Sequence, residues 1–119
     1  MKPRRADRVA EQLRQEIALL LLHETRDPEV TGVVVTGVRL SDDLGNARVR
    51  FVLEDPKKDR VQVEKALARS AGFLRSRLRE RLSLRAVPAL HFSFDTGLEH
   101  ERRIADLLGE IGREEKVRE

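Results

Sequence analysis

The sequence predicts an α+β domain in which helices cover one face of a small mixed β-sheet. Apolar residues recur every three or four positions over residues 6–24 and 63–82, a spacing that is typical of helices with one buried face. Apolar and polar residues alternate over residues 47–54 and 90–95, which is typical of strands that are buried on one side. A chain of 119 residues is the length of one ordinary domain.

The first half predicts a helix followed by a hairpin. In the helix, one stripe is formed by Val9, Leu13, Ile17, Leu20 and Leu21. Asp27-Pro28 ends it, because the residue before proline avoids helical backbone angles. Residues 33–40 are mostly apolar and rich in valine, and the turn residues 41–46 then lead into the alternating segment. Two strands joined by a short loop predict an antiparallel hairpin.

The second half predicts a long helix with an interruption, a strand and a last helix. Asp59 is a candidate N-cap, and an apolar stripe runs from Val63 to Leu82. Gly72 lies in the middle of the stripe, where glycine costs about 1 kcal/mol relative to alanine, so we expect a kink or a close backbone approach there. A third strand follows Pro88, and a capping box at residues 96–99 opens the last helix.

The order of these elements is α-β-β-α-(kink)-α-β-α, which is the order of a type II KH domain. Since the third strand returns after a helical crossover, it is expected to run parallel to one hairpin strand. We expect one domain over residues 1–112 and a charged, frayed tail over residues 113–119. The sequence has no cysteine and no membrane-length apolar run, and we expect a cytoplasmic protein without a secretory signal.

Positive charge is concentrated in one segment. The chain has 24 Lys and Arg against 21 Asp and Glu, a net charge of +3, and 19 of the basic residues are Arg. Residues 69–85 hold six Arg and a single acid, Glu80. Such a segment favours polyanion binding. A GC-rich genome or a hot-growing host also explains excess Arg, and a solvated helix face also explains an isolated Arg run.

Several segments resemble one family. They are Arg8-Val9, Thr25-Arg26-Asp27-Pro28, residues 38–44, residues 68–75 (Ala-Arg-Ser-Ala-Gly-Phe-Leu-Arg), residues 82–92 (Leu-Ser-Leu-Arg-Ala-Val-Pro-Ala-Leu-His-Phe) and Asp95. Together they resemble bacterial ribosome-binding factor A, a family of small-subunit maturation factors with a KH-like fold. The resemblance covers about residues 4–111.

The resemblance implies an RNA-binding surface around Gly72. KH domains commonly place a GxxG loop against the nucleic-acid backbone, and this sequence has none. The family instead has an Ala-x-Gly kink, with which Ser70-Ala71-Gly72 aligns except that Ser70 replaces the usual alanine. We expect phosphate contacts from the basic residues of this helix and a second basic cluster at the amino terminus. The predicted RNA-binding residues are Lys65, Arg69, Ser70, Ala71, Gly72, Arg75, Arg77, Arg79, Arg81, Arg85, Arg4, Arg5 and Arg8.

By resemblance, the protein would bind the 16S rRNA of the free, immature 30S ribosomal subunit. It would assist late assembly and processing of the rRNA 5′ end, with a role in cold adaptation. We expect a monomer without enzymatic activity, cofactor, metal, small-molecule substrate or membrane partner. Two alternatives stay open, namely a KH-like protein-interaction module and an RNA-binding protein that does not act on the ribosome. A small hydrolase or nuclease would need a convergent catalytic cluster.

The remaining candidate residues have simpler interpretations. His23, His91 and His100 lack metal-ligand spacing and are expected at the surface. The aromatic residues of the third strand, Phe92 and Phe94, could stack RNA bases but are expected to be core. Phe73 is expected to pack its helix against the sheet.

Overall fold

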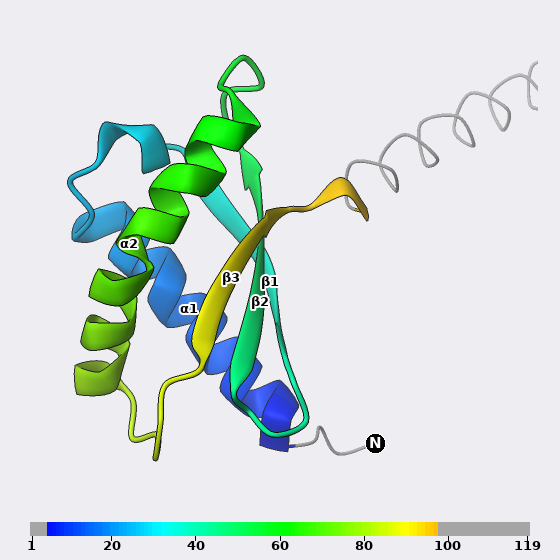
Figure 1. Ribbon diagram of the computed structural model, residues 1–119, viewed down its shortest axis with the longest axis vertical. Coiled ribbons are helices and arrows are strands. Elements are labelled where there is room, and N and C mark those ends of the chain that lie inside the picture. Colours follow the sequence, from blue (N-terminus) through cyan, green and yellow to red (C-terminus); the bar gives the residue numbers. More distant parts are fainter. Residues whose placement is uncertain (1–4, 98–119) are drawn as a thin grey trace, which may run out of the picture.

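The computed structural model describes residues 5–97, which form two helices over one face of a three-stranded sheet (Figure 1). In chain order the elements are α1 (Arg5–His23), a short 3-10 helix η1 (Pro28–Val30), β1 (Val33–Leu40), β2 (Asn46–Leu53), α2 (Arg60–Arg81) and β3 (Ala89–Phe94). The predicted α+β class is confirmed. Residues 96 and 97 are helical, as expected for the start of the last helix, and the rest of that helix and the tail at 113–119 lie outside the described residues.

The sheet has the order β1-β2-β3 and is mixed, as predicted. β1 pairs with β2 antiparallel, and β2 pairs with β3 parallel. An irregularity in the register between Val35 and Gly37 leaves one extra residue in β1. Gly32, with a φ of +83°, makes the turn between η1 and β1, a conformation that glycine adopts without strain.

The core lies between the sheet and the helices. Fully buried side chains come from every layer, with Leu13 and Ile17 from α1, Val49 and Phe51 from β2, and Leu74 from α2. The ring of Phe94 meets that of Phe51 edge-on at a centroid distance of 5.8 Å. Phe92 is also packed against the core, so both aromatic residues of β3 are core residues as predicted.

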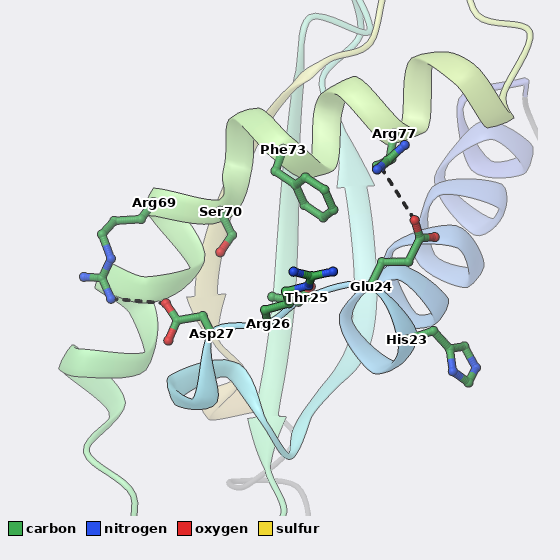
Figure 2. A pocket seen from close by; sticks show the side chains of 9 residues that line it. All are labelled: His23, Glu24, Thr25, Arg26, Asp27, Arg69, Ser70, Phe73 and Arg77. Carbon is green, nitrogen blue, oxygen red and sulfur yellow. Dashed lines mark hydrogen bonds and ion pairs between the residues drawn. The ribbon is translucent and has the colours of Figure 1, made fainter.

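α2 begins and bends where the sequence predicts. The Asp59 side chain caps it by accepting the Val61 backbone N–H at 2.9 Å. The helix expected on either side of Gly72 is one continuous helix of 22 residues. Its axis changes direction about halfway along (Figure 1), close to Ser70 in Figure 2. Glycine and serine are common where helices bend.

Candidate nucleic-acid interface

The segment that follows α1 is held by its own side chains. The Thr25 hydroxyl donates to the Leu20 carbonyl oxygen at 3.1 Å and so caps the end of α1. The Asp27 carboxylate caps η1 by accepting the Glu29 backbone N–H at 3.0 Å. Arg26, between these two caps, is exposed. The Thr-Arg-Asp-Pro motif therefore builds a hydrogen-bonded turn that presents the guanidinium group of Arg26, which has no ion-pair partner among residues 5–97.

This turn faces the middle of α2 across an open groove of about 660 Å³ (Figure 2). The end of α1 and the turn line one side, and the bend of α2 lines the other. The lining residues are His23, Glu24, Thr25, Arg26, Asp27, Arg69, Ser70, Phe73 and Arg77. The fold thus brings together two motifs, residues 25–28 and residues 68–75, that are separated by about forty positions in the sequence.

Phe73 is a groove residue, and the expectation that it packs α2 against the sheet is wrong. Its side chain is 38% exposed, and the Arg77 guanidinium carbon lies 5.3 Å from its ring centroid. The reason is its position on the helix. Leu74 and Leu78 occupy the stripe that faces the core, and Phe73 is one residue, or about 100°, away from it. An aromatic residue just off the apolar stripe was the signal for this site in the sequence.

The backbone at Gly72 is open on its outer side. A Cβ built at Gly72 would meet no heavy atom within 4 Å among the described residues. Gly72 is exposed and has no positive φ, so neither packing nor backbone geometry within residues 5–97 requires glycine there. Of its neighbours in the predicted motif, Ser70 and Ala71 are both half-buried. The missing side chain therefore leaves room for an external molecule rather than for the protein's own core.

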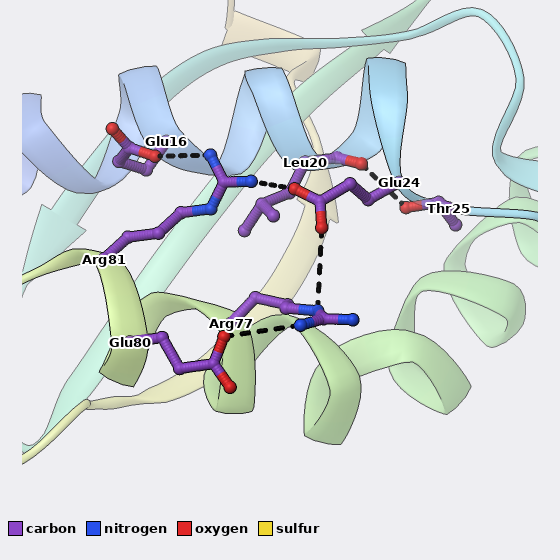
Figure 3. Close-up of polar contacts among 7 residues, drawn as sticks. All are labelled: Glu16, Leu20, Glu24, Thr25, Arg77, Glu80 and Arg81. Carbon is purple, nitrogen blue, oxygen red and sulfur yellow. Dashed lines mark hydrogen bonds and ion pairs between the residues drawn. The ribbon is translucent and has the colours of Figure 1, made fainter.

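Three of the predicted arginines make ion pairs with acids of α1 or of the turn that follows it, and Figure 3 shows the pairs of Arg77 and Arg81. Arg81 pairs with Glu16 at 3.4 Å and also with Glu24. Arg77 pairs with Glu24 at 3.6 Å and with Glu80 of its own helix at 3.3 Å. Across the groove, Arg69 pairs with Asp27 at 3.4 Å (Figure 2).

Arg75 has a structural role. It is half-buried, and its Nη2 donates to the Val87 carbonyl oxygen at 3.0 Å, which ties the loop before β3 to α2. Its Nε is buried without a hydrogen-bond partner. The structure therefore places Arg75 among contacts within the protein and away from the exposed surface of α2.

Most of the remaining predicted cations are exposed and unpaired within residues 5–97. Within residues 5–97, an exposed charge without an ion-pair partner is found at Arg5, Arg8, Lys65, Arg79 and Arg85. Arg26 joins them, although it is not among the RNA-binding residues predicted from the sequence. Arg4 lies outside the described residues. The predicted cluster is thus a mixture of paired, buried and free cations, and the free ones are the groups most available to phosphate.

Neither a group of metal-binding side chains nor a membrane-spanning helix is found in the described part of the chain. Between residues 5 and 97, no three His, Asp or Glu side chains are grouped so that they could hold a metal ion. His91 is exposed, as predicted, and its Nε2 lies 2.9 Å from the Asn46 side-chain oxygen. A search of the described helices finds none with the length and hydrophobicity of a membrane span.

Comparison with known proteins agrees with this arrangement. The family model described as ribosome-binding factor A matches residues 5–108. The ribosome-binding factor A of Desulfitobacterium hafniense is 43% identical over 117 residues, covering 98% of this chain and 93% of that protein. The protein of the same name from Syntrophus aciditrophicus is 43% identical over 113 residues, covering 95% and 92%.

Solved structures show the same fold. The crystal structure of ribosome-binding factor A from Thermus thermophilus superposes with a TM-score of 0.65 at 25% identity, covering 74% of this chain and 93% of that one. A homology model of the Thermus thermophilus protein, fitted into a cryo-electron microscopy map of its complex with the 30S subunit, gives a TM-score of 0.64 at 24% identity, covering 76% of this chain and 96% of that one. With a family model matched over nearly the whole chain and relatives at 43% identity, this protein belongs to the ribosome-binding factor A family.

Proposed function

We propose that this protein binds the 16S rRNA of the free, immature 30S subunit, and that it assists late assembly and processing of the rRNA 5′ end. It acts in the cytoplasm as a monomer, without enzymatic activity or a cofactor, and it supports assembly in the cold. Family membership supports the ribosomal partner. The observation that carries the proposal is the groove in which an exposed aromatic ring faces a guanidinium group that has no ion-pair partner within residues 5–97, beside a helix whose backbone is open at Gly72.

The groove suits an unpaired nucleotide better than a duplex. Phe73 offers a ring face on which a base can stack, an interaction worth about 1–3 kcal/mol per base. Arg26 supplies a cation on the facing wall that pairs with no acid in the described part of the chain, and the Ser70 hydroxyl can exchange hydrogen bonds with a base edge or a ribose. At Gly72, the absence of a side chain allows an RNA backbone to approach the helix. We therefore assign this groove to a single-stranded segment of rRNA.

The cations of α2 and of the loop that follows it supply the phosphate contacts. Arg79, Arg85 and Lys65 are exposed and have no partner within residues 5–97, so they can bind phosphate directly. Arg69, Arg77 and Arg81 reach phosphate by exchanging a carboxylate partner for it, which costs little because exposed ion pairs are worth about 0–1 kcal/mol. Arg75 is left out of the RNA contacts because it bonds to Val87.

The test is co-sedimentation with purified small subunits over a salt series, with wild type, Phe73→Leu and Arg26→Gln. Leucine keeps an apolar side chain but removes the stacking face, so we expect at least fivefold weaker binding at every salt concentration. Removing the Arg26 charge should weaken binding mainly at low salt. Leu22→Ala, which trims a 74% exposed side chain outside the groove lining, is the matched control and should bind as wild type does. Wild-type affinity in Phe73→Leu would overturn the stacking assignment.

A protein partner is the second candidate function, and two exposed leucines favour it. Leu19 and Leu22 lie three residues apart on α1 and are 45% and 74% exposed. A protein-interaction module that docks through them would keep its affinity at high salt and lose it in Leu19→Ser/Leu22→Ser. The RNA-binding proposal expects the opposite pattern, with a steep loss of affinity at high salt and no effect of these two substitutions.

A further inference from the structure

The outer face of the sheet, opposite the helices, carries three arginines. Side chains alternate along β2, so that Ala47, Val49 and Phe51 point into the core. The residues between them, Arg48 and Arg50, therefore point outward. The pairing register continues this pattern across the sheet, with Arg39 directly opposite Arg48 and Gly37 opposite Arg50.

These arginines are not neutralised by the described part of the chain. None of the three makes an ion pair or a side-chain hydrogen bond within residues 5–97. Arg39 and Arg48 are exposed, and like charges placed directly opposite each other on a sheet destabilise it. Arg50 is half-buried because its Nη2 lies over Gly37, 3.5 Å from where a Cβ would be. Repulsion between these arginines lowers the stability of the folded protein, and a bound anionic ligand would relieve it.

The nearest carboxylates lie beyond the two ends of this face or are already engaged. Along the strand direction, Glu54 is four residues from Arg50 and six from Arg48, about 13 and 20 Å, and both distances exceed the screening length of about 8 Å at physiological salt. Asp95, just after β3, is 7% exposed and accepts the Thr36 hydroxyl at 2.6 Å. In the hairpin loop, Asp43 accepts hydrogen bonds from Ser41 and from the Gly45 backbone N–H. Asp42 in the same loop is exposed and pairs with no arginine among the described residues.

We propose that this arginine face, defined as Arg39, Arg48 and Arg50, binds the phosphate backbone of a helical RNA segment. The choice of ligand follows from what the face offers. Between residues 5 and 97 it presents guanidinium groups, His91 and small polar or valine side chains, with no aromatic ring on which a base could stack. Phosphate contact without base contact is the way in which proteins bind RNA helices.

The arginine face and the groove lie on opposite sides of the sheet. α1 and α2, which form the groove, cover the inner face of the sheet (Figure 1), and the alternation of side chains along the strands places the arginines on the outer face. One molecule could therefore hold a single strand in the groove and a neighbouring RNA helix on the sheet. This inference rests on the proposed function only in taking RNA as the ligand.

The experiment measures binding of the full chain to a fluorescent 16-base-pair RNA hairpin by anisotropy over a salt series. In Arg39→Gln/Arg48→Gln, we expect the slope of log affinity against log salt to become shallower by about 1.8, since each phosphate contact contributes about 0.9 to it. Arg39→Lys/Arg48→Lys keeps both charges and should keep the slope. Lys57→Gln removes an exposed cation that has no ion-pair partner among residues 5–97 and lies outside the arginine face, so it should also keep the slope.

Thermal melting of the same variants provides a second readout. Because the glutamines relieve repulsion, the melting temperature should stay unchanged or rise. A lower melting temperature would mean that the protein's own acids, including those of residues 98–119, neutralise the face, and it would overturn the proposal. An unchanged salt slope would also overturn it. Phe73→Leu, measured in parallel on a single-stranded oligonucleotide, tests the groove separately. A negative result for one surface therefore does not contradict the proposal for the other.

Discussion

Replacing Gly72 with alanine is expected to make the protein more stable and at the same time weaken its binding to RNA. Gly72 lies inside α2 without a positive φ, and a Cβ there meets no heavy atom within 4 Å. Alanine should therefore raise the free energy of unfolding by the difference in helix propensity, about 0.5–1 kcal/mol. For a domain of this size, that corresponds to a melting temperature roughly 2–6 °C higher. The added methyl group occupies the space through which an RNA backbone would approach.

Two measurements on the same preparation check this prediction. Circular dichroism at 222 nm gives the melting temperature, and co-sedimentation with small subunits gives the affinity, which we expect to fall about tenfold. Ala68→Gly/Gly72→Ala is the matched control, because Ala68 is an exposed position one turn earlier in the same helix. Glycine at 68 returns the stability to near the wild-type value and adds no atoms that could obstruct RNA. The double variant should therefore still bind weakly.

The refuting results are distinct. A melting temperature below wild type would mean that glycine relieves a strain in α2, and the account of Gly72 as an open site for a ligand would be wrong. Higher stability with unchanged affinity would mean that RNA does not approach the helix at this point. Recovery of binding in Ala68→Gly/Gly72→Ala would show that flexibility of α2, rather than space beside it, is what RNA binding needs.

Three further predictions concern single side chains. Arg75→Ala should lower the free energy of unfolding by about 1–2 kcal/mol in urea denaturation, because the Val87 carbonyl loses its donor, with little change in the salt dependence of RNA binding. In Asp43→Asn, the free energy of unfolding should fall less between neutral and acid pH than it does in the wild type. Hydrogen bonds from Ser41 and Gly45 hold the pKa of Asp43 in the folded protein below its value in the unfolded chain. The ionised carboxylate therefore stabilises the fold fully above the unfolded-state pKa, and this stabilisation is lost as the pH falls through the folded-state pKa. Glu24→Gln should raise affinity for small subunits about threefold at low salt, with unchanged stability by thermal melting.

Most of the fold could be predicted from the sequence because its signals are local. The valine-rich run over residues 33–40 and the alternation that follows it set two strands, and β1 has the predicted bounds. Asp59 acts as the cap that its position indicates. The Lys58 side chain is a different case, since it donates to the carbonyl oxygens of Pro28, Glu29 and Thr31 and so ties the start of α2 to η1. A lysine contact across about thirty residues leaves no periodic signal.

The site was only partly predictable, because many of its contacts join residues that are far apart in the sequence. The motif around Gly72 identified the right helix, but a count of charges along the chain could not show which arginines are free. Arg81 pairs with Glu16 and Glu24, which lie 65 and 57 residues away, and these partners come together only when α1 packs beside α2. Arg26 was missed because one arginine in a turn is unremarkable until the fold places it across from Phe73.

The ion pairs of α2 decide whether Glu24→Gln raises or lowers the affinity for small subunits. Glu24 repels an incoming phosphate, and at about 6 Å in water that repulsion is about 0.7 kcal/mol, or threefold in affinity. It also orders Arg77 and Arg81, and losing that order would cost binding about 0.5–1.5 kcal/mol per side chain. Each arginine, however, has a second carboxylate partner, Glu80 for Arg77 and Glu16 for Arg81. The order therefore survives in Glu24→Gln while the repulsion disappears, and affinity should rise. Weaker binding in this variant would show that Glu24 alone positions the two arginines for RNA.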